Sequence, residues 1–238
     1  MKKILVPIAF SFLLPVAAHG ETLQNFVSGI GNLDVNLKIV LLITIISLAP
    51  AILITLTAFT RIVIILSLLR NALGTPQTPP NQVIIALSLF LTVFVMRPVF
   101  TKIDQVAIKP YMEKEITDVE AINRAIVPIK EFLIKNTRKE DMKLFMDLSG
   151  EKVKSPQELS MVTLIPAFII SEIKTAFIVV FVIYLPFIVI DMLVASILMS
   201  MGMMMIPPMM LSLPFKLILF VLSDGWELLI KAIVGSYR

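Results

Sequence analysis

Hydrophobic residues in this chain gather into long runs that charged residues seldom interrupt. A helix that crosses the hydrocarbon core of a bilayer needs about 20 consecutive apolar residues. The runs at 39–60 and 161–190 meet or exceed that length and contain prolines, so helices there must kink, tilt or project. Two further runs lie at 83–96 and 192–222. We expect Arg97-Pro98 to end the run at 83–96, Asp191 to end the run at 161–190, and Gly74 to end the first long helix as a C-terminal cap. The pattern predicts an all-α membrane protein built from two long kinked helical hairpins.

Residues 101–158 have a different pattern, because they hold 22 of the chain's 38 charges, 11 of each sign. Capping boxes and a proline at a first helical position predict three helix starts in this segment. They are Thr117-x-x-Glu120, Thr137-x-x-Glu140 and Ser155-Pro156-x-Glu158. We therefore expect a small helical subdomain, placed on the periplasmic side of the membrane.

The start of the chain has the layout of a cleavable secretory signal, with Lys2 and Lys3, an apolar middle and small residues before Glu21. Arg61 and Arg70 lie near the tip of the first hairpin, which the positive-inside rule assigns to the cytoplasm, in agreement with an exported N-terminus. The expected segments are a signal peptide at 1–20, an N-terminal segment with the first hairpin at 21–100, the helical subdomain at 101–158, and the second hairpin with the C-terminal tail at 159–238.

Composition narrows the classes of function. The chain is 58% hydrophobic, with a mean hydropathy of +0.94, which is typical of membrane proteins. Its net charge of +4 forms no basic stripe, so we expect no nucleic-acid partner. There is no cysteine, and the one histidine, His19, falls within the expected signal. No GxSxG motif or Gly-rich phosphate loop occurs, so we expect no enzyme, cofactor or metal site.

Seven of the chain's 14 methionines lie in the twelve residues Met199–Met210. Gly202, Pro207 and Pro208 should break a helix in this stretch. Irregular backbone at membrane depth is tolerated only where protein or a water-filled cavity covers it. Methionine adapts to irregular surfaces better than other apolar residues. Two interpretations stay open here, a deformable seal across a conduit and a methionine-rich turn between two buried helices.

Ionisable residues also lie within the apolar runs or beside them. Such groups face a bundle interior or water and pair with one another, because hydrocarbon does not solvate them. We predict an ion pair between Glu172 and Lys216 of adjacent subunits, with a proton relay through Glu172 as the alternative. Lys174 is either buried in the same way or reaches an edge of the membrane with its long side chain. The other buried charges that we expect are Asp191 and Arg61.

Several stretches resemble motifs of the FliP/SctR family of type III secretion export-gate proteins, and the resemblance covers residues 40–238. One departure is that Val179 and Val180 stand where the first long motif commonly has a glycine. The expected signal and the insert at 101–158 resemble the flagellar branch of the family. The matching stretches are Phe59–Arg61, Arg70–Gly74, Pro79–Gln82, Pro166–Phe177, Pro186–Ser196, Met201–Pro208, Leu213–Lys216 and Leu222–Trp226.

The resemblance implies a pore-forming subunit of the flagellar export gate, in which a methionine loop seals a channel for unfolded flagellar proteins. It implies a homo-oligomer, a five-copy ring, that assembles with FliQ and FliR and is aided by FliO. It also implies a multi-pass protein of the bacterial inner membrane, located at the flagellum basal body. The pore gasket would be Met201, Met203, Met204, Met205, Pro207 and Pro208, and the inter-subunit ion pair Glu172 with Lys216.

Three alternatives to this function stay open. One is a purely structural scaffold, in which no change in the methionine loop would alter permeability. The chain would be an injectisome export-gate subunit if it belonged to the virulence branch. A secondary transporter or ion channel would need a substrate site at the membrane midplane, usually formed by broken helices of an internal repeat. The two hairpins show no detectable repeat, so the transporter is less favoured.

Overall fold

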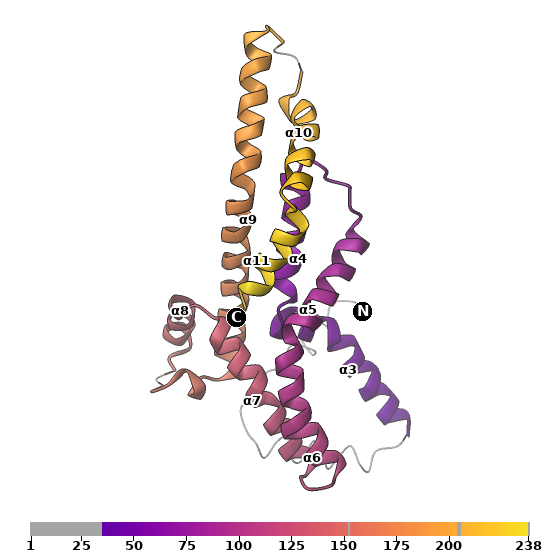
Figure 1. The fold of residues 1–238 in the computed structure, drawn as a ribbon. Helices are drawn as coiled ribbons and strands as arrows, with labels where there is room; N and C mark the ends of the chain where they lie inside the picture. The colour runs from indigo at the N-terminus through magenta and orange to yellow at the C-terminus, as the bar shows by residue number, and fades with distance from the viewer. Residues whose placement is uncertain (1–34, 152, 204–205, 238) are drawn as a thin grey trace, which may run out of the picture. The chain divides into compact units, whose positions relative to one another are not determined.

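The computed structural model describes residues 35–151, 153–203 and 206–237, which form helices joined by turns, with no strand among them (Figure 1). The predicted all-α class is confirmed, while the expected signal at 1–20 lies outside the described residues. The elements in chain order are α3 (Val35–Leu56), α4 (Phe59–Ala72), α5 (Asn81–Ile103), a π-helical stretch (Asp104–Ile108), α6 (Lys109–Met112), α7 (Asp118–Asn136), α8 (Lys139–Ser149), a 3-10 turn (Pro156–Glu158), α9 (Met161–Ser200), α10 (Pro208–Leu222) and α11 (Gly225–Gly235).

The chain divides into two compact units. The described part of the first unit comprises residues 35–56, 97–151 and 153–169, and that of the second unit comprises residues 57–96, 170–203 and 206–237. Each unit has buried apolar side chains of its own, such as Leu133 in the first and Ile62 in the second. The expected segment boundaries, the hairpin arrangement and the periplasmic placement of 101–158 stay predictions.

In the first unit, α7 buries one apolar face. Phe132 and Leu133 are buried, and the Phe132 ring meets the Phe168 ring of α9 edge to face, with ring centroids 5.9 Å apart. Thr117 begins α7 as predicted, because its hydroxyl oxygen accepts the backbone N–H of Glu120 at 3.4 Å. The first capping box therefore located this helix correctly.

The second capping box predicts α8 within one residue, but Thr137 is not its cap, because Arg138 occupies that position without a side-chain hydrogen bond. The Thr137 hydroxyl donates to the Leu133 carbonyl at 2.7 Å, so the residue ends α7, and α8 begins at Lys139. Threonine commonly bonds backward to the carbonyl four residues earlier, and that bond competes with a forward cap. The start predicted at Ser155 yields only the single 3-10 turn at Pro156–Glu158, without a side-chain cap.

Helix α9 carries a cap that the sequence analysis missed. The Ser160 hydroxyl oxygen accepts the backbone N–H of Thr163 at 3.2 Å. The Glu151 carboxylate in turn accepts the Ser160 N–H at 3.2 Å, the Thr163 hydroxyl at 2.9 Å and the Ser160 hydroxyl. These hydrogen bonds, the one from the Ser160 hydroxyl above all, lower the pKa of Glu151. Three residues therefore tie a loop of the first unit to the first turn of α9.

Two helices run further than the sequence predicts. An end at Arg97-Pro98 is wrong, because α5 continues through Pro98 to Ile103. A proline removes only one intrahelical hydrogen bond, which long apolar helices tolerate. An end at Asp191 is also wrong, because α9 continues to Ser200. Asp191 can stay within the helix since a lysine of α10 pairs with its carboxylate, as the next subsection describes.

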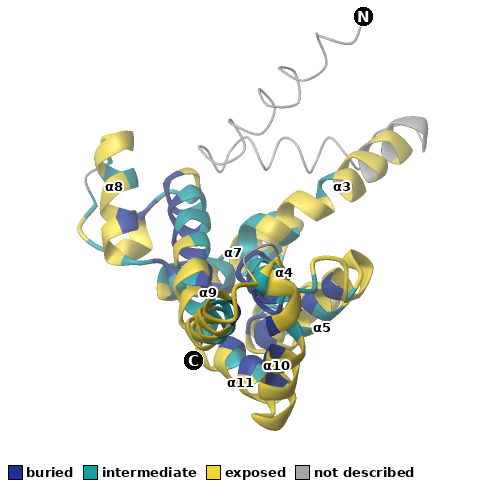
Figure 2. Cartoon of the chain, turned by 90° about the horizontal axis from the view of Figure 1, so that it is seen from above, coloured by how far each residue is buried: buried dark blue, intermediate teal, exposed yellow. Residues whose placement is uncertain are grey.

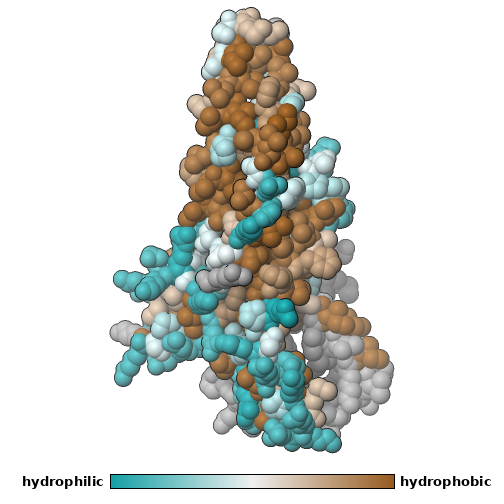
Figure 3. All heavy atoms as spheres, in the orientation of Figure 1, coloured by the Kyte–Doolittle hydropathy of each residue, from teal (hydrophilic) through white to brown (hydrophobic). Residues whose placement is uncertain are grey.

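Among the described residues, two helices are long and apolar enough to cross a membrane, residues 81–112 and 161–200. Helices α3 and α4, which a break at Thr57 and Ala58 separates, make a third candidate if they form one broken span. Of the 30 residues of α9 beyond residue 170, 14 are exposed and 10 are partly exposed within the chain, and exposed stretches are also seen in the view along α9 (Figure 2). Hydrophobic residues make up most of the visible surface of α9 and α10 (Figure 3). Lipid or other protein must cover such a surface in water.

In the second unit, Gly74 ends α4 as predicted. Its φ of +80° lies in the left-handed region that glycine enters without strain. The Gly74 N–H donates to the Asn71 carbonyl at 3.0 Å, and the Thr75 N–H donates to the Arg70 carbonyl at 3.2 Å. This pair of bonds is the Schellman motif, which satisfies carbonyls that would otherwise be unpaired at a helix end.

Gly202 ends α9 by the same device, with a φ of +74°. The Gly202 N–H donates to the Met199 carbonyl at 3.1 Å, and the Met203 N–H donates to the Leu198 carbonyl at 2.9 Å. Helix α10 then begins with Pro208 at its first position, where the missing N–H costs nothing. The predicted break in the methionine-rich stretch is therefore confirmed.

Candidate functional site

A buried cluster of polar side chains joins α4, α9 and the end of the chain. Arg61 of α4 donates to Glu172 of α9 through both Nε, at 3.1 Å to Oε2, and Nη2, to Oε1. Its Nη1 donates to the carbonyl and hydroxyl oxygens of Ser236, at 3.2 and 2.9 Å. The Tyr237 hydroxyl donates to Glu172 Oε2 at 2.5 Å. We call these four residues the Arg61 cluster.

The Arg61, Glu172 and Tyr237 side chains of the Arg61 cluster are buried, and the polar atoms of the cluster are hydrogen-bonded to one another. The side chains of Arg61 and Glu172 are 3% and 0% exposed. The guanidinium also lies 3.9 Å from the centroid of the Tyr237 ring, within the range of a cation–π contact. Burial, and then the Glu172 carboxylate, raise the pKa of the Tyr237 phenol well above its usual value, so the phenol keeps its proton and donates it.

A second buried pair joins α9 and α10. Lys216 is 1% exposed, and its Nζ donates to Asp191 Oδ2 at 2.6 Å and to the Ala72 carbonyl at 3.4 Å. The Ser212 hydroxyl donates to Asp191 Oδ1 at 2.5 Å. Burying an unpaired ammonium group costs free energy, and the Asp191 carboxylate and the Ala72 carbonyl offset that cost for Lys216. Together with the Arg61 cluster, the pair fixes α4, α9 and α10 of the second unit to one another.

The predicted buried charges therefore find partners that the sequence analysis did not assign. Arg61, Glu172 and Lys216 are buried as expected, and Asp191 is partly exposed. Within one chain, Glu172 meets Arg61 and Lys216 meets Asp191. A Glu172–Lys216 pair between adjacent subunits stays a prediction. Lys174 lies on the exposed face of α9.

The sequence analysis missed Ser236, Tyr237 and Ser212 as members of these sites. The apolar tail ahead of Ser236 and Tyr237 gave a signal, because a tail of that kind packs against something. Nothing in the local pattern points to Ser212, because it is a single small polar residue within the apolar run at 192–222.

The methionine-rich loop between α9 and α10 presents apolar side chains to its surroundings. Met201 and Met203 are 65% and 43% exposed, and Pro207 is also exposed, while Pro208 begins α10. Met204 and Met205 lie outside the described residues. The thioethers are flexible and polarizable, so they can close against a changing surface, and they offer neither a nucleophile nor a proton donor.

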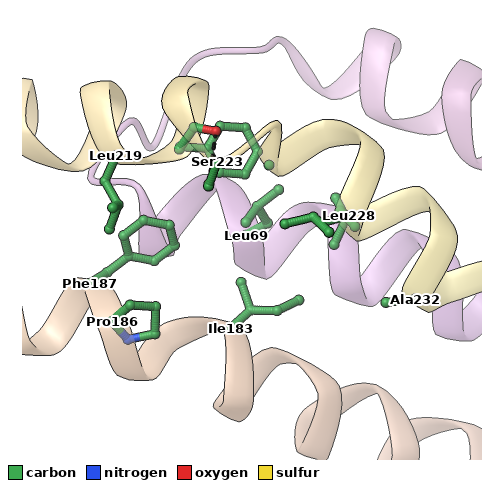
Figure 4. A pocket seen from close by; sticks show the side chains of 11 residues that line it. Leu69, Ile183, Pro186, Phe187, Leu219, Ser223, Leu228 and Ala232 are labelled. Carbon is green, nitrogen blue, oxygen red and sulfur yellow. Dashed lines mark hydrogen bonds between the residues drawn. The ribbon is translucent and has the colours of Figure 1, made fainter.

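The second unit also holds an apolar pocket of about 260 Å³ between α4, α9, α10 and α11 (Figure 4). Phe187, Ile183 and Leu219 point into it, and Ser223 is its only polar side chain, with a hydroxyl that donates to the Phe220 carbonyl. A catalytic pocket needs several convergent polar groups, so this pocket is a packing space between helices. In the described part of the chain, no cluster of three or more His, Cys, Asp or Glu side chains could hold a metal ion.

Comparison with known proteins relates nearly the whole chain to one family. The FliP family model matches residues 42–233. The flagellar biosynthetic protein FliP of Aquifex aeolicus is 52% identical over 213 residues, which cover 88% of this chain and 89% of the relative. The protein of the same name from Bacillus subtilis is 52% identical over 207 residues, 87% of this chain and 94% of the relative. That of Pectobacterium carotovorum is 45% identical over 219 residues, 92% and 85%.

Proposed function

Because this chain belongs to the FliP family, we propose that it is a pore-forming subunit of the flagellar type III protein export gate. Relatives that share about half of its residues are named flagellar biosynthetic proteins. Two helices that can cross a membrane fit a multi-pass protein of the bacterial inner membrane, at the flagellum basal body. The function is conduction of unfolded flagellar proteins and involves no catalysis.

The observation that carries this proposal is the methionine loop. It presents exposed thioethers, Met201 and Met203, between two helices that buried ion pairs hold in place. A soft loop on a fixed frame can close a channel at rest and yield to a passing chain. We propose that Met201, Met203, Met204, Met205, Pro207 and Pro208 of several copies form that gasket.

The exposed apolar surface of α9 and α10 (Figure 3) supports an assembled state. Copies of this chain would form a five-copy ring with FliQ and FliR, aided by FliO. The predicted Glu172–Lys216 pair would then form between copies, and each residue would exchange its partner within the chain for one in the neighbour. Such an exchange keeps Glu172 and Lys216 paired, as burial requires. Arg61 would then keep the Ser236 oxygens and the Tyr237 ring, and Asp191 the Ser212 hydroxyl, unless the neighbouring copy supplies new partners for both.

A single introduced cysteine tests whether the loop lines the export channel. The chain has no cysteine, so Met203→Cys supplies a unique thiol. The variant would replace the natural FliP of a flagellated bacterium that makes an exported flagellar protein fused to a domain that cannot unfold. We expect the stalled protein, carrying one cysteine, to be cross-linked to position 203 by a short bifunctional thiol reagent.

Lys139→Cys is the matched control, because Lys139 is exposed at the start of α8, in the other unit. It should give no cross-link to the stalled protein. Equal cross-linking from both positions, or none from position 203 while export is blocked, would contradict a channel lined by the loop.

A further inference from the structure

Arg70, in the last turn of α4, has one edge of its guanidinium hydrogen-bonded, and the other edge, which we call the open edge, has no acceptor among the described residues. Its Nη1 donates to the Pro79 carbonyl at 3.1 Å and to Asn81 Oδ1 at 2.7 Å, which fixes the plane of the group. Its Nε is buried and has no acceptor among the described residues. Within the same residues, no carboxylate lies within 4.0 Å of the guanidinium.

The open edge, Nε with Nη2, is the pair of parallel donors that a carboxylate or phosphate accepts in two-pronged fashion. A buried N–H without an acceptor costs free energy and calls for an explanation, such as a ligand. The described residues provide no anion at this point, so we consider a ligand from outside the chain.

An apolar pocket of about 270 Å³ adjoins the guanidinium. Arg70 is its only charged lining residue. The apolar lining includes Leu66 of α4, Leu73 just after α4, Ile84 and Leu87 of α5, and Trp226 of α11. This volume is below the range of most sites for whole small molecules. It suits part of an acyl chain, with the head group at Arg70.

The pocket lies beside a polar turn, which suits a site for a lipid head group at a membrane–water interface. Arg70 adjoins the turn between α4 and α5, in which residues 76–78 are exposed and polar or proline. Trp226, which is 45% exposed, stands at the rim, and tryptophan is enriched at membrane–water interfaces. Val83, which lines the pocket, and Phe90, further along α5, are both exposed apolar residues.

We propose that Arg70 and this pocket form a binding site for an anionic phospholipid, with the lipid phosphate on the open edge of Arg70 and an acyl chain in the pocket. A cation without a counter-ion favours a lipid of net negative charge over a zwitterionic one. A carboxylate of a partner protein would satisfy the guanidinium equally well, but it would leave the adjoining apolar pocket unfilled.

The test is competitive lipid retention by the full-length protein. The protein is purified in detergent with equal amounts of phosphatidylglycerol and phosphatidylcholine, and the lipids that remain bound are counted by native mass spectrometry. The wild-type chain should retain phosphatidylglycerol in preference. Arg70→Gln should lose that preference, with binding weaker on the order of tenfold, as expected for a lost charge-assisted pair of hydrogen bonds.

Two further variants keep the test decisive. Arg97→Gln removes the same charge from an exposed position of α5 and should change nothing. Leu87→Trp fills the pocket, keeps every hydrogen bond of Arg70 and should lower retention of both lipids. Equal retention of the two lipids by the wild-type chain, or an unchanged preference in Arg70→Gln, would overturn the proposal.

The source of the anion is tested in parallel. Excess inorganic phosphate should leave the bound phosphatidylglycerol in place, since the acyl chain contributes to binding. Its displacement by phosphate would point to a simple anion site and contradict the proposal. A photo-crosslinker at position 87 that captures a second protein chain, in membranes, in place of lipid would contradict it as well.

Discussion

The same kinds of charged residues serve different purposes in two regions of the molecule. On α5 and α7 the ion pairs lie at the surface: the side chains of Lys102 and Glu131 are 61% and 55% exposed. Between α4 and α9, Arg61 and Glu172 are 3% and 0% exposed. Solvent screens the first pair, so it contributes little, whereas the second would leave a bare charge in an apolar interior if either partner were lost.

The second unit combines helices that buried ion pairs fix with a loop that no ion pair in its described part restrains. Buried pairs hold α4, α9 and α10 of the second unit in one arrangement. The methionine loop that follows α9 has exposed side chains and no ion pair in its described part. A seal requires a deformable loop held by rigid helices. The buried ion pairs contribute to the proposed function by keeping the helices on either side of the loop in place.

The largest effect is expected from Glu172→Ala. It leaves the Arg61 guanidinium buried without its carboxylate and should lower the free energy of unfolding by about 3–5 kcal/mol. Thermal unfolding of the purified protein in detergent measures it. Glu131→Ala, which breaks an exposed pair, is the matched control, and a similar loss in both variants would contradict the contrast.

Gly225→Ala should have the next largest effect. A methyl group at Gly225 would lie 2.3 Å from the Phe220 ring, so the ring must move toward the neighbouring pocket. Overpacking of this kind costs about 1–3 kcal/mol, measurable by the same unfolding experiment. In Gly235→Ala the new methyl meets nothing within 4 Å, so that variant should be neutral or slightly more stable. Equal losses at both glycines would argue against close packing at Gly225.

Ser160→Ala should remove about 1 kcal/mol, because it deletes the cap of α9. It should also flatten the dependence of stability on acid. Since the pKa of Glu151 is lowered in the folded state, its contribution is present above the ordinary carboxylate pKa and is lost as pH falls through the lowered one. Unfolding curves between neutral and strongly acidic pH should therefore converge for the two proteins. Parallel curves would show that Glu151 acts independently of Ser160.

The smallest effect is expected from Lys102→Ala. Its partner Glu131 is solvated on its own, so the loss should stay below about 0.5 kcal/mol and shrink further with added salt. Chemical unfolding at low and high salt would detect it. A loss as large as that of Glu172→Ala would erase the distinction between the two regions.

Local sequence signals predict most of the helices of the fold, but they predict only part of the candidate site. Thr117, Gly74 and Gly202 act on their nearest neighbours, so their positions predict helix ends correctly. Burial of Arg61, Glu172 and Lys216 follows from their apolar surroundings. Their partners do not follow, because Arg61 and Glu172 are 111 residues apart and the pairing depends on tertiary packing.

The extent of α9 shows the same limit. Asp191 within an apolar run predicts a helix end, since an unpaired carboxylate would seek water. Lys216, on the next helix, removes that need by pairing with Asp191 at 2.6 Å. Likewise the Thr137 hydroxyl could either bond backward to the Leu133 carbonyl or cap the helix that follows. Which bond forms depends on the free energies of the end of α7 and the start of α8.

The most direct test of the central claim is ion conductance across membranes that contain the assembled export gate. Replacing Met201 and Met203–Met205 by alanine should raise the resting conductance while export continues, because small side chains cannot close the channel. Leucine at the same positions, with similar bulk, should leak much less. A resting conductance that stays at the wild-type level in the alanine variant would contradict a methionine seal.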